Sequence, residues 1–421
     1  MNLILQDKKI YRNFVFILAN ISVFLFFALL LPTKSGHSIA IIAGLTACIL
    51  STPLWKENKT TKEIKITCFF FLFLALFWSH TFDGIFSFST QGDHFLRYFL
   101  GIFFIIGFSR ITIHPRFIMY GLAIGSIASG IVALYQYKTI GRAEGFTNAI
   151  RFGNLAMLMG LICFIAALFD FFRKTERCFF VAASGFALLA SILSLSRGGW
   201  LILIAIPFLA FFIFQENKKL IILFIATFIP IIFIFSHLPP VEARIQEAKE
   251  QITGYFNQHE KYVDSSLGAR LEQWKTAFSM GIEKPFTGWG DKNIKAGKLE
   301  YIERGIADPS IMNYPHAHND FLEAWARRGM IGVVSLLAIY LAPILLIIAS
   351  YKKTKSMISD SKDLNTINKI LLLSGVLIYF GYFIFGLSDV FFTFVIGHNF
   401  YLFSLIFILS SMQWIRKANS K

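Results

Sequence analysis

The sequence contains little charge for its length and is especially short of acidic residues. Only 15% of the 421 residues are charged, and 25 Asp and Glu stand against 40 Lys and Arg. Hydrophobic residues make up 56% of the chain, and 49 residues are Phe. This composition excludes an ordinary soluble fold, because apolar runs of about 18 or more residues are typical of membrane spans. The positive charge does not favour nucleic-acid binding, since basic residues lie between apolar runs, as topology signals do.

Cysteine is scarce, and the four that occur have no metal-ligand spacing. Cys48, Cys68, Cys163 and Cys178 all lie in or at the edge of apolar runs, so we interpret them as packing residues. The N-terminus is basic and then apolar, but no small-residue cleavage site follows. We therefore predict an uncleaved first helix rather than a signal peptide.

The apolar runs predict an all-α polytopic membrane protein with about twelve transmembrane helices. We expect helices 1–9 within residues 1–236, a large and partly helical loop domain over 237–329, and helices 10–12 with a cytoplasmic tail over 330–421. The predicted spans are 14–31, 38–55, 66–80, 95–109, 117–136, 152–172, 178–195, 199–214, 219–236, 330–350, 368–386 and 390–413.

The distribution of Lys and Arg predicts the orientation of these spans. Basic residues concentrate in one alternating set of connections, and the other short connections contain only Lys34, Lys138, Arg142, Arg151 and Arg197. Because Lys and Arg mark the cytoplasmic side, both termini should be cytoplasmic and the 237–329 loop should lie outside. The basic set comprises residues 8–12, 56–65, 110–116, 173–177, 218–219, 352–369 and 416–421.

The long loop has its own structure. Its length of about 90 residues is typical of a functional segment rather than a connection. Residues 241–256 have helical periodicity, with Val241, Ile245, Ile252 and Phe256 near one side. A second helix is predicted within 265–290, with Leu271, Trp274 and Phe278 at i, i+3 and i+7 on an apolar face. A turn at Gly288 and Gly290 follows it.

The most polar cluster of its size, YPHAHNDFLEAWARRG over residues 314–329, comes directly before a long apolar run. Asp320 and Glu323 resemble an N-terminal capping box, and Gly329 fits a helix stop. His318 and Asn319 would then lie just before a helix at the membrane surface. The positive end of the helix dipole favours a neutral imidazole, as a general base requires, and attracts anions. A plain structural cap is the alternative interpretation of His318.

A metal site is a second alternative for this cluster. His316, His318 and Asp320 could supply nitrogen and oxygen ligands, although their i, i+2 spacing requires an extended segment and no fourth ligand is obvious. We therefore predict no metal site.

Several further charged residues fall on the predicted outer side. Arg197, in SLSRGGWL, lies between two apolar runs, where an arginine is costly and usually functional or paired. Arg270 lies in the second loop helix, and Asp389 joins the last two spans. Arg142 and Arg151 are weaker candidates of the same kind. Guanidinium groups suit pyrophosphate, whereas snorkelling, solvation and helix capping are the alternative interpretations.

The sequence contains no P-loop, dinucleotide fingerprint or retaining-type carboxylate pair. An enzyme outside the cytoplasm cannot rely on ATP or nucleotide sugars. A donor that is activated beforehand and anchored in lipid is therefore the expected substrate.

At these residues the chain resembles the bacterial O-antigen ligase superfamily, over nearly its whole length. HNDFLEAWARRG matches the family's His-Asn, nine residues, Gly pattern through His318, Asn319 and Gly329. RGGWL matches its Arg, three residues, Leu pattern through Arg197. SSLGARLEQW and GLSDV, which contain Arg270 and Asp389, are similar to the enterobacterial ligases in particular.

The resemblance implies a GT-C-like membrane glycosyltransferase of the bacterial inner membrane with its active site facing the periplasm. It implies inverting, metal-independent transfer of O-antigen from undecaprenyl pyrophosphate to a sugar hydroxyl of lipid A–core, with no cofactor. His318 is the implied base, and Arg197 and Arg270 are the implied pyrophosphate ligands. Asp389, His316, Asn319 and Arg142 would support them.

Three rivals stay open from sequence. The first is an O-antigen polymerase of the same superfamily, which extends the glycan on its carrier. The second is the protein-glycosylating branch, whose members tend to have additional C-terminal soluble domains. The third is a polytopic transporter or flippase, which usually has polar or broken helices at mid-membrane.

Overall fold

The computed structural model describes residues 2–57, 60–78, 92–203, 206 and 218–419, and within these ranges the chain is helical without a β-strand. Eight of the described helices are long and apolar enough to cross a membrane. The prediction of an all-α polytopic membrane protein is therefore confirmed. The predicted spans 66–80 and 199–214 lie partly outside the described residues.

Helices α1 to α7 and α9 make up the described N-terminal part of the chain. Helix α1 packs against α2 and α5, and α6 and α7 pack against each other and against α5. The elements are α1 (Asn2–Leu29), α2 (Gly36–Ser51), η1 (Thr52–Glu57), α3 (Lys62–Phe73), the π-helical η2 (Leu74–Trp78), α4 (Gly92–Ile111), α5 (Pro115–Ile140), α6 (Ala149–Leu168), α7 (Lys174–Leu193), η3 (Arg197–Trp200) and α9 (Lys218–Ser236).

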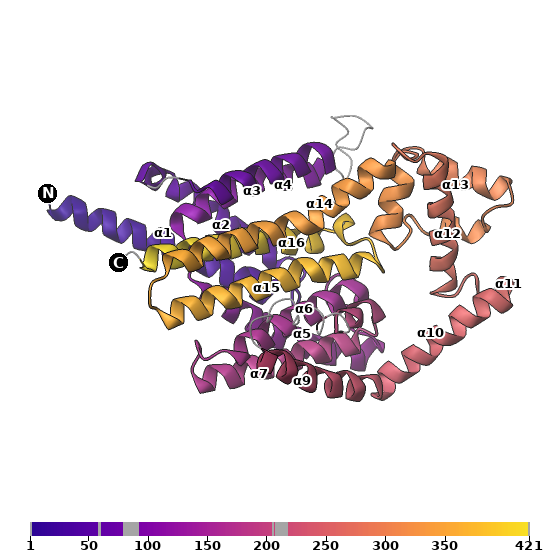
Figure 1. Cartoon of the computed structure of the whole chain (residues 1–421), viewed down its shortest axis with the longest axis horizontal. Coiled ribbons are helices and arrows are strands. Elements are labelled where there is room, and N and C mark those ends of the chain that lie inside the picture. Colours follow the sequence, from indigo (N-terminus) through magenta and orange to yellow (C-terminus); the bar gives the residue numbers. More distant parts are fainter. Residues whose placement is uncertain (1, 58–59, 79–91, 204–205, 207–217, 420–421) are drawn as a thin grey trace.

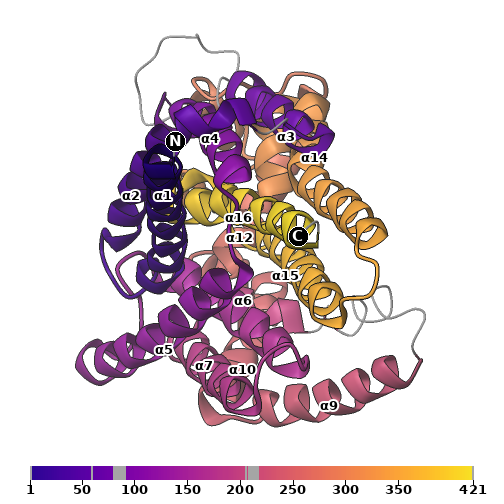
Figure 2. The same cartoon turned by 90° about the vertical axis from the view of Figure 1, so that its left-hand side faces the viewer.

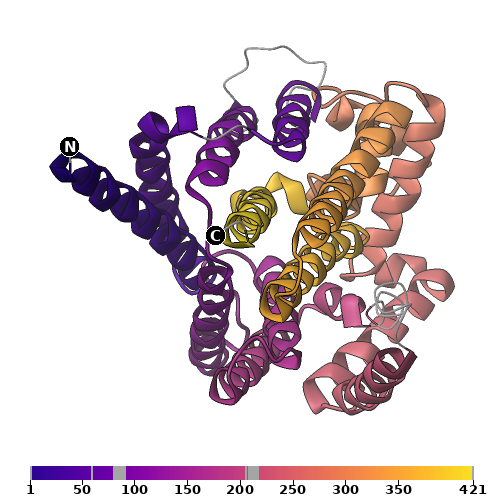
Figure 3. The ribbon, with the colours of Figure 1, turned by 60° about the vertical axis from the view of Figure 1, so that its left-hand side comes forward.

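The last helix is the centre of the bundle. Helix α16 (Val395–Asn419) is almost completely buried and contacts α4, α14 (Asp320–Met357) and α15 (Lys362–Gly386). Figures 2 and 3 show it between the N-terminal helices and the α14–α15 pair. Two buried tyrosines join these helices, since Tyr379 donates to the carbonyl of Tyr401 and Tyr401 donates to that of Ile339. These two buried hydroxyls are thus paired with backbone oxygens, which an apolar environment favours.

The segment between α9 and α14 folds around a second, smaller apolar core. In Figure 1 it projects from the bundle at the end opposite the two chain termini. The structure contains the two helices expected here and adds two short elements and one helix. They are α10 (Pro239–Asn257), α11 (His259–Tyr262), α12 (Gly268–Glu283), α13 (Ile294–Glu303) and η4 (Pro309–Asn313).

The expected apolar faces of the two loop helices are wrong in part. Phe256 of α10 is 73% exposed and Phe278 of α12 is 54% exposed. Helix α12 instead buries Glu272, Gln273 and Thr276. The reason is that Glu272 and Gln273 hydrogen-bond residues 308 and 311, which pack on α12. These hydrogen bonds accompany the apolar contacts of Ala277 and Met280 in the second core.

The start of α14 differs from the expected capping box. Asn319, not Asp320, is the N-cap, and its Oδ1 accepts from the backbone N–H groups of Phe321 and Leu322. Glu323 accepts from the backbone N–H of Ala317 instead of closing a box. At Gly329 the first helical part of α14 ends, as expected, and a second helical part continues beyond the kink. Gly329 has φ +58° and ψ −149°, a backbone conformation that essentially only glycine adopts.

Candidate active site

His318 and Asp389 form the centre of the candidate site. His318 immediately precedes the Asn319 cap and has a left-handed φ of +49°, which is uncommon for a residue with a side chain. Its Nδ1 lies 3.1 Å from Oδ1 of Asp389, between α15 and η5. An ionised carboxylate can only accept a hydrogen bond, so Nδ1–H donates and Nε2 is left as the acceptor. The pair therefore has the geometry of a general base whose imidazole is oriented by a carboxylate.

The surroundings of Asp389 favour the ionised form of its carboxyl group. Burial alone would raise the pKa of this carboxyl, but the hydrogen bond and charge of His318 outweigh it, and the pKa is lowered. His316 behaves differently. Its ring centre is 4.3 Å from that of His318, and burial followed by the charge of His318 lowers the pKa of His316 to about 4. His316 is thus neutral at physiological pH.

The segment before His318 is held by hydrogen bonds to its backbone from three directions. The donors come from α12, α13 and α14, so the loop is fixed by the fold around it rather than by its own sequence. The bonds are Trp274 Nε1 to the Ala317 carbonyl at 2.9 Å, Lys298 Nζ to that of Tyr314 at 3.0 Å, and Arg327 Nη2 to that of Pro315 at 2.9 Å.

Asn319 joins the segment that contains His318 to the turn that contains Asp389. In addition to capping α14, its Nδ2 donates to the carbonyl oxygen of Leu387 at 3.1 Å. Leu387 is two residues from Asp389 and follows the end of α15. One side chain therefore sets the position of α14 against the turn that contains the carboxylate.

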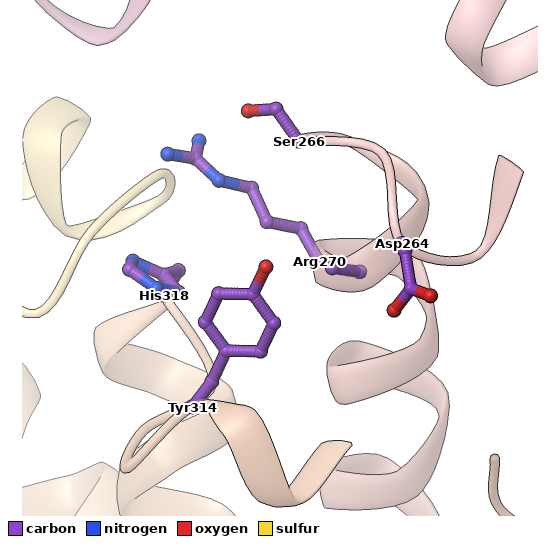
Figure 4. Close-up of a pocket in the computed structure, with 6 residues that line it drawn as sticks. Asp264, Ser266, Arg270, Tyr314 and His318 are labelled. Atoms are coloured by element: carbon purple, nitrogen blue, oxygen red, sulfur yellow. The ribbon is translucent and has the colours of Figure 1, made fainter. Parts of the chain in front are cut away.

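A pocket of about 360 Å³ opens beside His318. Figure 4 shows the side chain of Arg270 reaching across it toward the side on which His318 lies, with Tyr314 between them and Asp264 on the other side. Burial lowers the pKa of Arg270, while the charge of Asp389 and the phenol of Tyr314 act in the opposite direction. The lining residues are Asp264, Ser266, Ala269, Arg270, Tyr314 and His318.

Three more arginines form a chain that leads to this pocket. Arg197 does not line the pocket, but its Nη1 donates to the carbonyl of Arg244 in α10 at 3.1 Å. Burial, then the charge of Arg244, lowers the pKa of Arg197. Glu247 acts in the opposite direction, and the charge of Arg270 adds the smallest lowering effect. Burial and the charge of Arg244 likewise lower the pKa of Arg142. Arg244 forms an ion pair with Glu247. Its charge nevertheless acts on Arg197 and Arg142, and a bound anion would relieve that repulsion.

Arg151 joins the same cluster from α6. Its guanidinium lies over the ring of Phe394 and interacts electrostatically with Asp389 and His316. Asp389 therefore interacts electrostatically with two histidines, His316 and His318, and with two arginines, Arg151 and Arg270.

The side chains that could hold a metal ion differ from the set of His316, His318 and Asp320 that was considered from sequence. Donor atoms of His316, His318 and Asp389 all lie within 4.8 Å of one another. Asp320, the carboxylate considered from sequence, instead accepts a hydrogen bond from Tyr340 in the protein interior. The charges of Arg151 and Arg270 near Asp389 disfavour a divalent cation at this position.

Several residues of the site were not predicted, among them Asp264 and Ser266 of the pocket lining, Tyr314 and Arg244. Tyr314 begins the polar cluster and lines the pocket, but its side chain gave no signal of its own. Arg244 was interpreted only as part of an amphipathic helix, because α10 is distant in sequence from every predicted motif. Its contact with Arg197 depends on how α10 leaves the bundle, as Figure 1 shows.

Comparison with known proteins places this geometry in a family context. Residues 182–337, which include Arg197, Arg270 and His318, match the sequence model of the family described as O-Antigen ligase. The resemblance to the O-antigen ligase superfamily is confirmed. A Haemophilus influenzae protein described as uncharacterized is 28% identical over 403 residues, covering 92% of this chain and 96% of that protein. An O-antigen ligase of Escherichia coli is 26% identical over 247 residues, 56% of this chain and 55% of that ligase.

The similarity to the O-antigen ligase family supports a role of the ligase or polymerase type. Such a protein is a glycosyltransferase-like enzyme. Together with the apolar helices, this similarity makes this chain a multi-pass membrane protein.

Proposed function

We propose that this protein transfers O-antigen polysaccharide from undecaprenyl pyrophosphate to a sugar hydroxyl of lipid A–core, on the periplasmic face of the bacterial inner membrane. The observation that carries the proposal is a hydrogen-bonded His318–Asp389 pair that shares one pocket with Arg270. A base and an anion-binding guanidinium in one pocket are what displacement of a diphosphate by a hydroxyl requires.

In the proposed reaction, Nε2 of His318 takes the proton of the acceptor hydroxyl. The hydroxyl oxygen forms a bond to the anomeric carbon from the face opposite the diphosphate. The bond between that carbon and the diphosphate oxygen breaks, and the electron pair leaves with undecaprenyl pyrophosphate. The configuration at the anomeric carbon is thereby inverted.

Arg197 and Arg270 would bind the diphosphate and stabilise the charge that builds on it as it leaves. The mutual repulsion of the arginine cluster supports this role, because the diphosphate is the anion that would relieve it. Asp389 would keep the imidazole in the tautomer with a free Nε2 and stabilise it once it is protonated. His316 and Asn319 position these two groups, and Arg142 adds positive charge at the far end of the cluster.

The proposed reaction needs no metal ion or other cofactor. Asp389 already accepts from His318, and two arginines near it disfavour a divalent cation. If His316, His318 and Asp389 held a metal, EDTA would abolish activity, and metal addition would restore it.

Reconstitution with lipid-linked glycan and purified lipid A–core, in the presence of EDTA, tests the proposal. We expect glycan on lipid A–core with the wild type and a loss of roughly 10²-fold or more with His318→Ala. His237→Ala, which changes an exposed histidine outside the pocket, should retain activity. Normal transfer by His318→Ala would contradict the assigned base.

The same assay separates the ligase from its rivals. A polymerase would lengthen glycan on the carrier and leave lipid A–core unmodified. A member of the protein-glycosylating branch would require a protein acceptor. A transporter or flippase would yield no new covalent product.

A further inference from the structure

A second pocket lies at the opposite end of the bundle, where both chain termini are found (Figure 1). It has a volume of about 620 Å³, larger than the pocket beside His318. Its walls come from α1, η1, the end of α4 and α16, so it opens between helices that are far apart in sequence. The lining residues are Lys9, Arg12, Asn13, Val15, Phe16, Leu54, Arg110, Ile111, Thr112, Trp414, Lys417 and Ala418.

The charge of this pocket has one sign. Four of its lining residues are cationic, and none of the described residues that line it is acidic. Positive charge at this end of a membrane protein is ordinary as a topology signal. A topology signal, however, needs only solvated basic residues, and it does not require four of them to converge on one cavity.

Two of the cations are fixed in place by the fold. Arg110 donates from Nη1 to the carbonyl of Trp55 at 2.6 Å and from Nη2 to Oγ1 of Thr60. Lys417 donates to the carbonyl oxygen of Arg110 at 3.0 Å. All three of these acceptors are uncharged, so these hydrogen bonds hold the two cationic side chains in place at the pocket.

The other two cations belong to one face of α1. Lys9 and Arg12 are three residues apart, and Asn13 and Phe16 continue the same face into the pocket. Like charges at this spacing repel each other. Both side chains are exposed, and the described part of the chain gives neither an ion-pair partner. An anion in the pocket would neutralise both.

The pocket is apolar where it faces the membrane-spanning parts of its helices. Val15, Phe16 and Ile111 line it, and the indole of Trp414 lies tilted against the ring of His114, with 4.3 Å between ring centres. Next to the basic face of α1, a stripe of exposed apolar residues runs along the same helix: Ile10, Phe14, Ile17 and Ile21. A ligand with an anionic head and an apolar tail fits this junction, because both surfaces are offered side by side.

We propose that this pocket binds the phosphodiester headgroup of an anionic phospholipid from the adjacent leaflet. The headgroup lies between Lys9, Arg12, Arg110 and Lys417, and the acyl chains follow the exposed stripe of α1. The shared chemistry is that of a phosphate group, and the apolar walls favour a lipid over free phosphate. This assignment is independent of the glycosyl transfer proposed above.

The experiment is native mass spectrometry of the full chain in detergent with phosphatidylglycerol or phosphatidylcholine. The wild type should retain phosphatidylglycerol preferentially. The double variant Lys9→Gln/Arg12→Gln should lose that preference by roughly tenfold or more, because each basic residue near an anionic headgroup contributes measurably. Both residues are exposed on a helix surface, so the fold should tolerate the changes.

The matched control is Lys352→Gln/Lys355→Gln, which removes two exposed charges at the same end of the molecule but outside the pocket. It should bind as the wild type does. Equal binding of the two lipids by the wild type, or an equal loss in the control, overturns the proposal.

Two further arms separate a lipid from soluble phosphate and locate the site. Inorganic phosphate should not displace phosphatidylglycerol, and displacement would overturn the assignment to a lipid. Brominated phosphatidylglycerol should quench the fluorescence of the wild type more than that of Trp414→Phe. Equal quenching would place the lipid elsewhere and overturn the site.

Discussion

At the scale of single residues, the site combines groups that are individually unremarkable in sequence. His318 is defined by two neighbours that the sequence separates widely: Asp389, which orients it, and Arg270, which shares its pocket. The proposed reaction therefore depends on His318, Asp389 and Arg270 together and not on the histidine alone. Arg197 and Arg244 extend it with positive charge.

Replacing Arg197 by Lys should test the assigned diphosphate contact. A point charge cannot reproduce a guanidinium fork, and a lost hydrogen bond to a charged group costs about 1.5–3 kcal/mol, which is roughly 10- to 100-fold. We expect kcat/KM for the lipid-linked donor to fall by that factor. Arg177→Lys is the matched control, because Arg177 also donates to a backbone carbonyl but lies away from the pocket. Wild-type kinetics with Lys at position 197 would contradict a bidentate contact.

At the scale of elements, the loop that contains His318 is positioned by its partners. Helices α12, α13 and α14 each donate to one of its carbonyl oxygens. At the kink at Gly329, the backbone N–H of Met330 donates to the carbonyl of Pro285, which follows α12, at 2.7 Å, and the rest of α14 then enters the bundle.

Gly329→Ala should therefore destabilise the protein. A Cβ at this position would lie 2.5 Å from backbone atoms of both Pro285 and Phe286, in addition to the strain of a positive φ. We expect a loss of about 3 kcal/mol or more, measured as a lowered unfolding temperature in detergent. Gly305→Ala is the control, because Gly305 has φ +68° with nothing within 4 Å and should cost only about 1–2 kcal/mol. Equal losses would show that crowding at Gly329 is unimportant.

Lys298 should make the stability of the loop depend on pH. Burial lowers its pKa to about 8, although Glu323 acts in the opposite direction. Because the unfolded value is about 10.4, the folded state binds fewer protons between these values, and stability should rise with pH from about 8 to 10. Lys298→Met removes this rise, so the difference in unfolding temperature between wild type and variant should change in favour of the wild type across that window. Lys295→Met, at an exposed position of the same helix, should leave the pH dependence unchanged.

At the scale of the whole molecule, the two pockets lie at opposite ends of the helical bundle. At one end, His318 and several arginines lie next to the folded segment between α9 and α14. At the other end, four cationic side chains line a pocket at the membrane boundary. If the bundle spans the inner membrane as proposed, each pocket faces one leaflet.

Cysteine accessibility should establish this sidedness. In a variant without the four native cysteines, Glu303→Cys lies in α13, and Asp360→Cys lies in the turn between α14 and α15. A membrane-impermeant maleimide should label position 303 from the periplasm of cells with a permeable outer membrane. Position 360 should react only after the inner membrane is opened. Reversed labelling would place His318 in the cytoplasm and remove the proposed substrate.

Much of the fold could be predicted from sequence because hydrophobic length and periodicity are local properties. The eight described membrane-length helices fall on predicted spans, and α10 and α12 lie where helical periodicity was recognised. The buried faces of those two helices could not be predicted. Glu272, Gln273 and Thr276 are buried by hydrogen bonds to distant loops, and local polarity contains no signal of such partners.

The sequence by itself determined the class of protein, the number and rough position of most helices, and the motif residues His318, Arg197, Arg270 and Asp389. These depend on composition and on short patterns within single segments. Only the tertiary structure decided which of them meet: Asp389 with His318, Arg270 in the same pocket, and Arg197 against α10 instead. The reason is that these contacts join residues dozens of positions apart, and their geometry depends on how the helices pack.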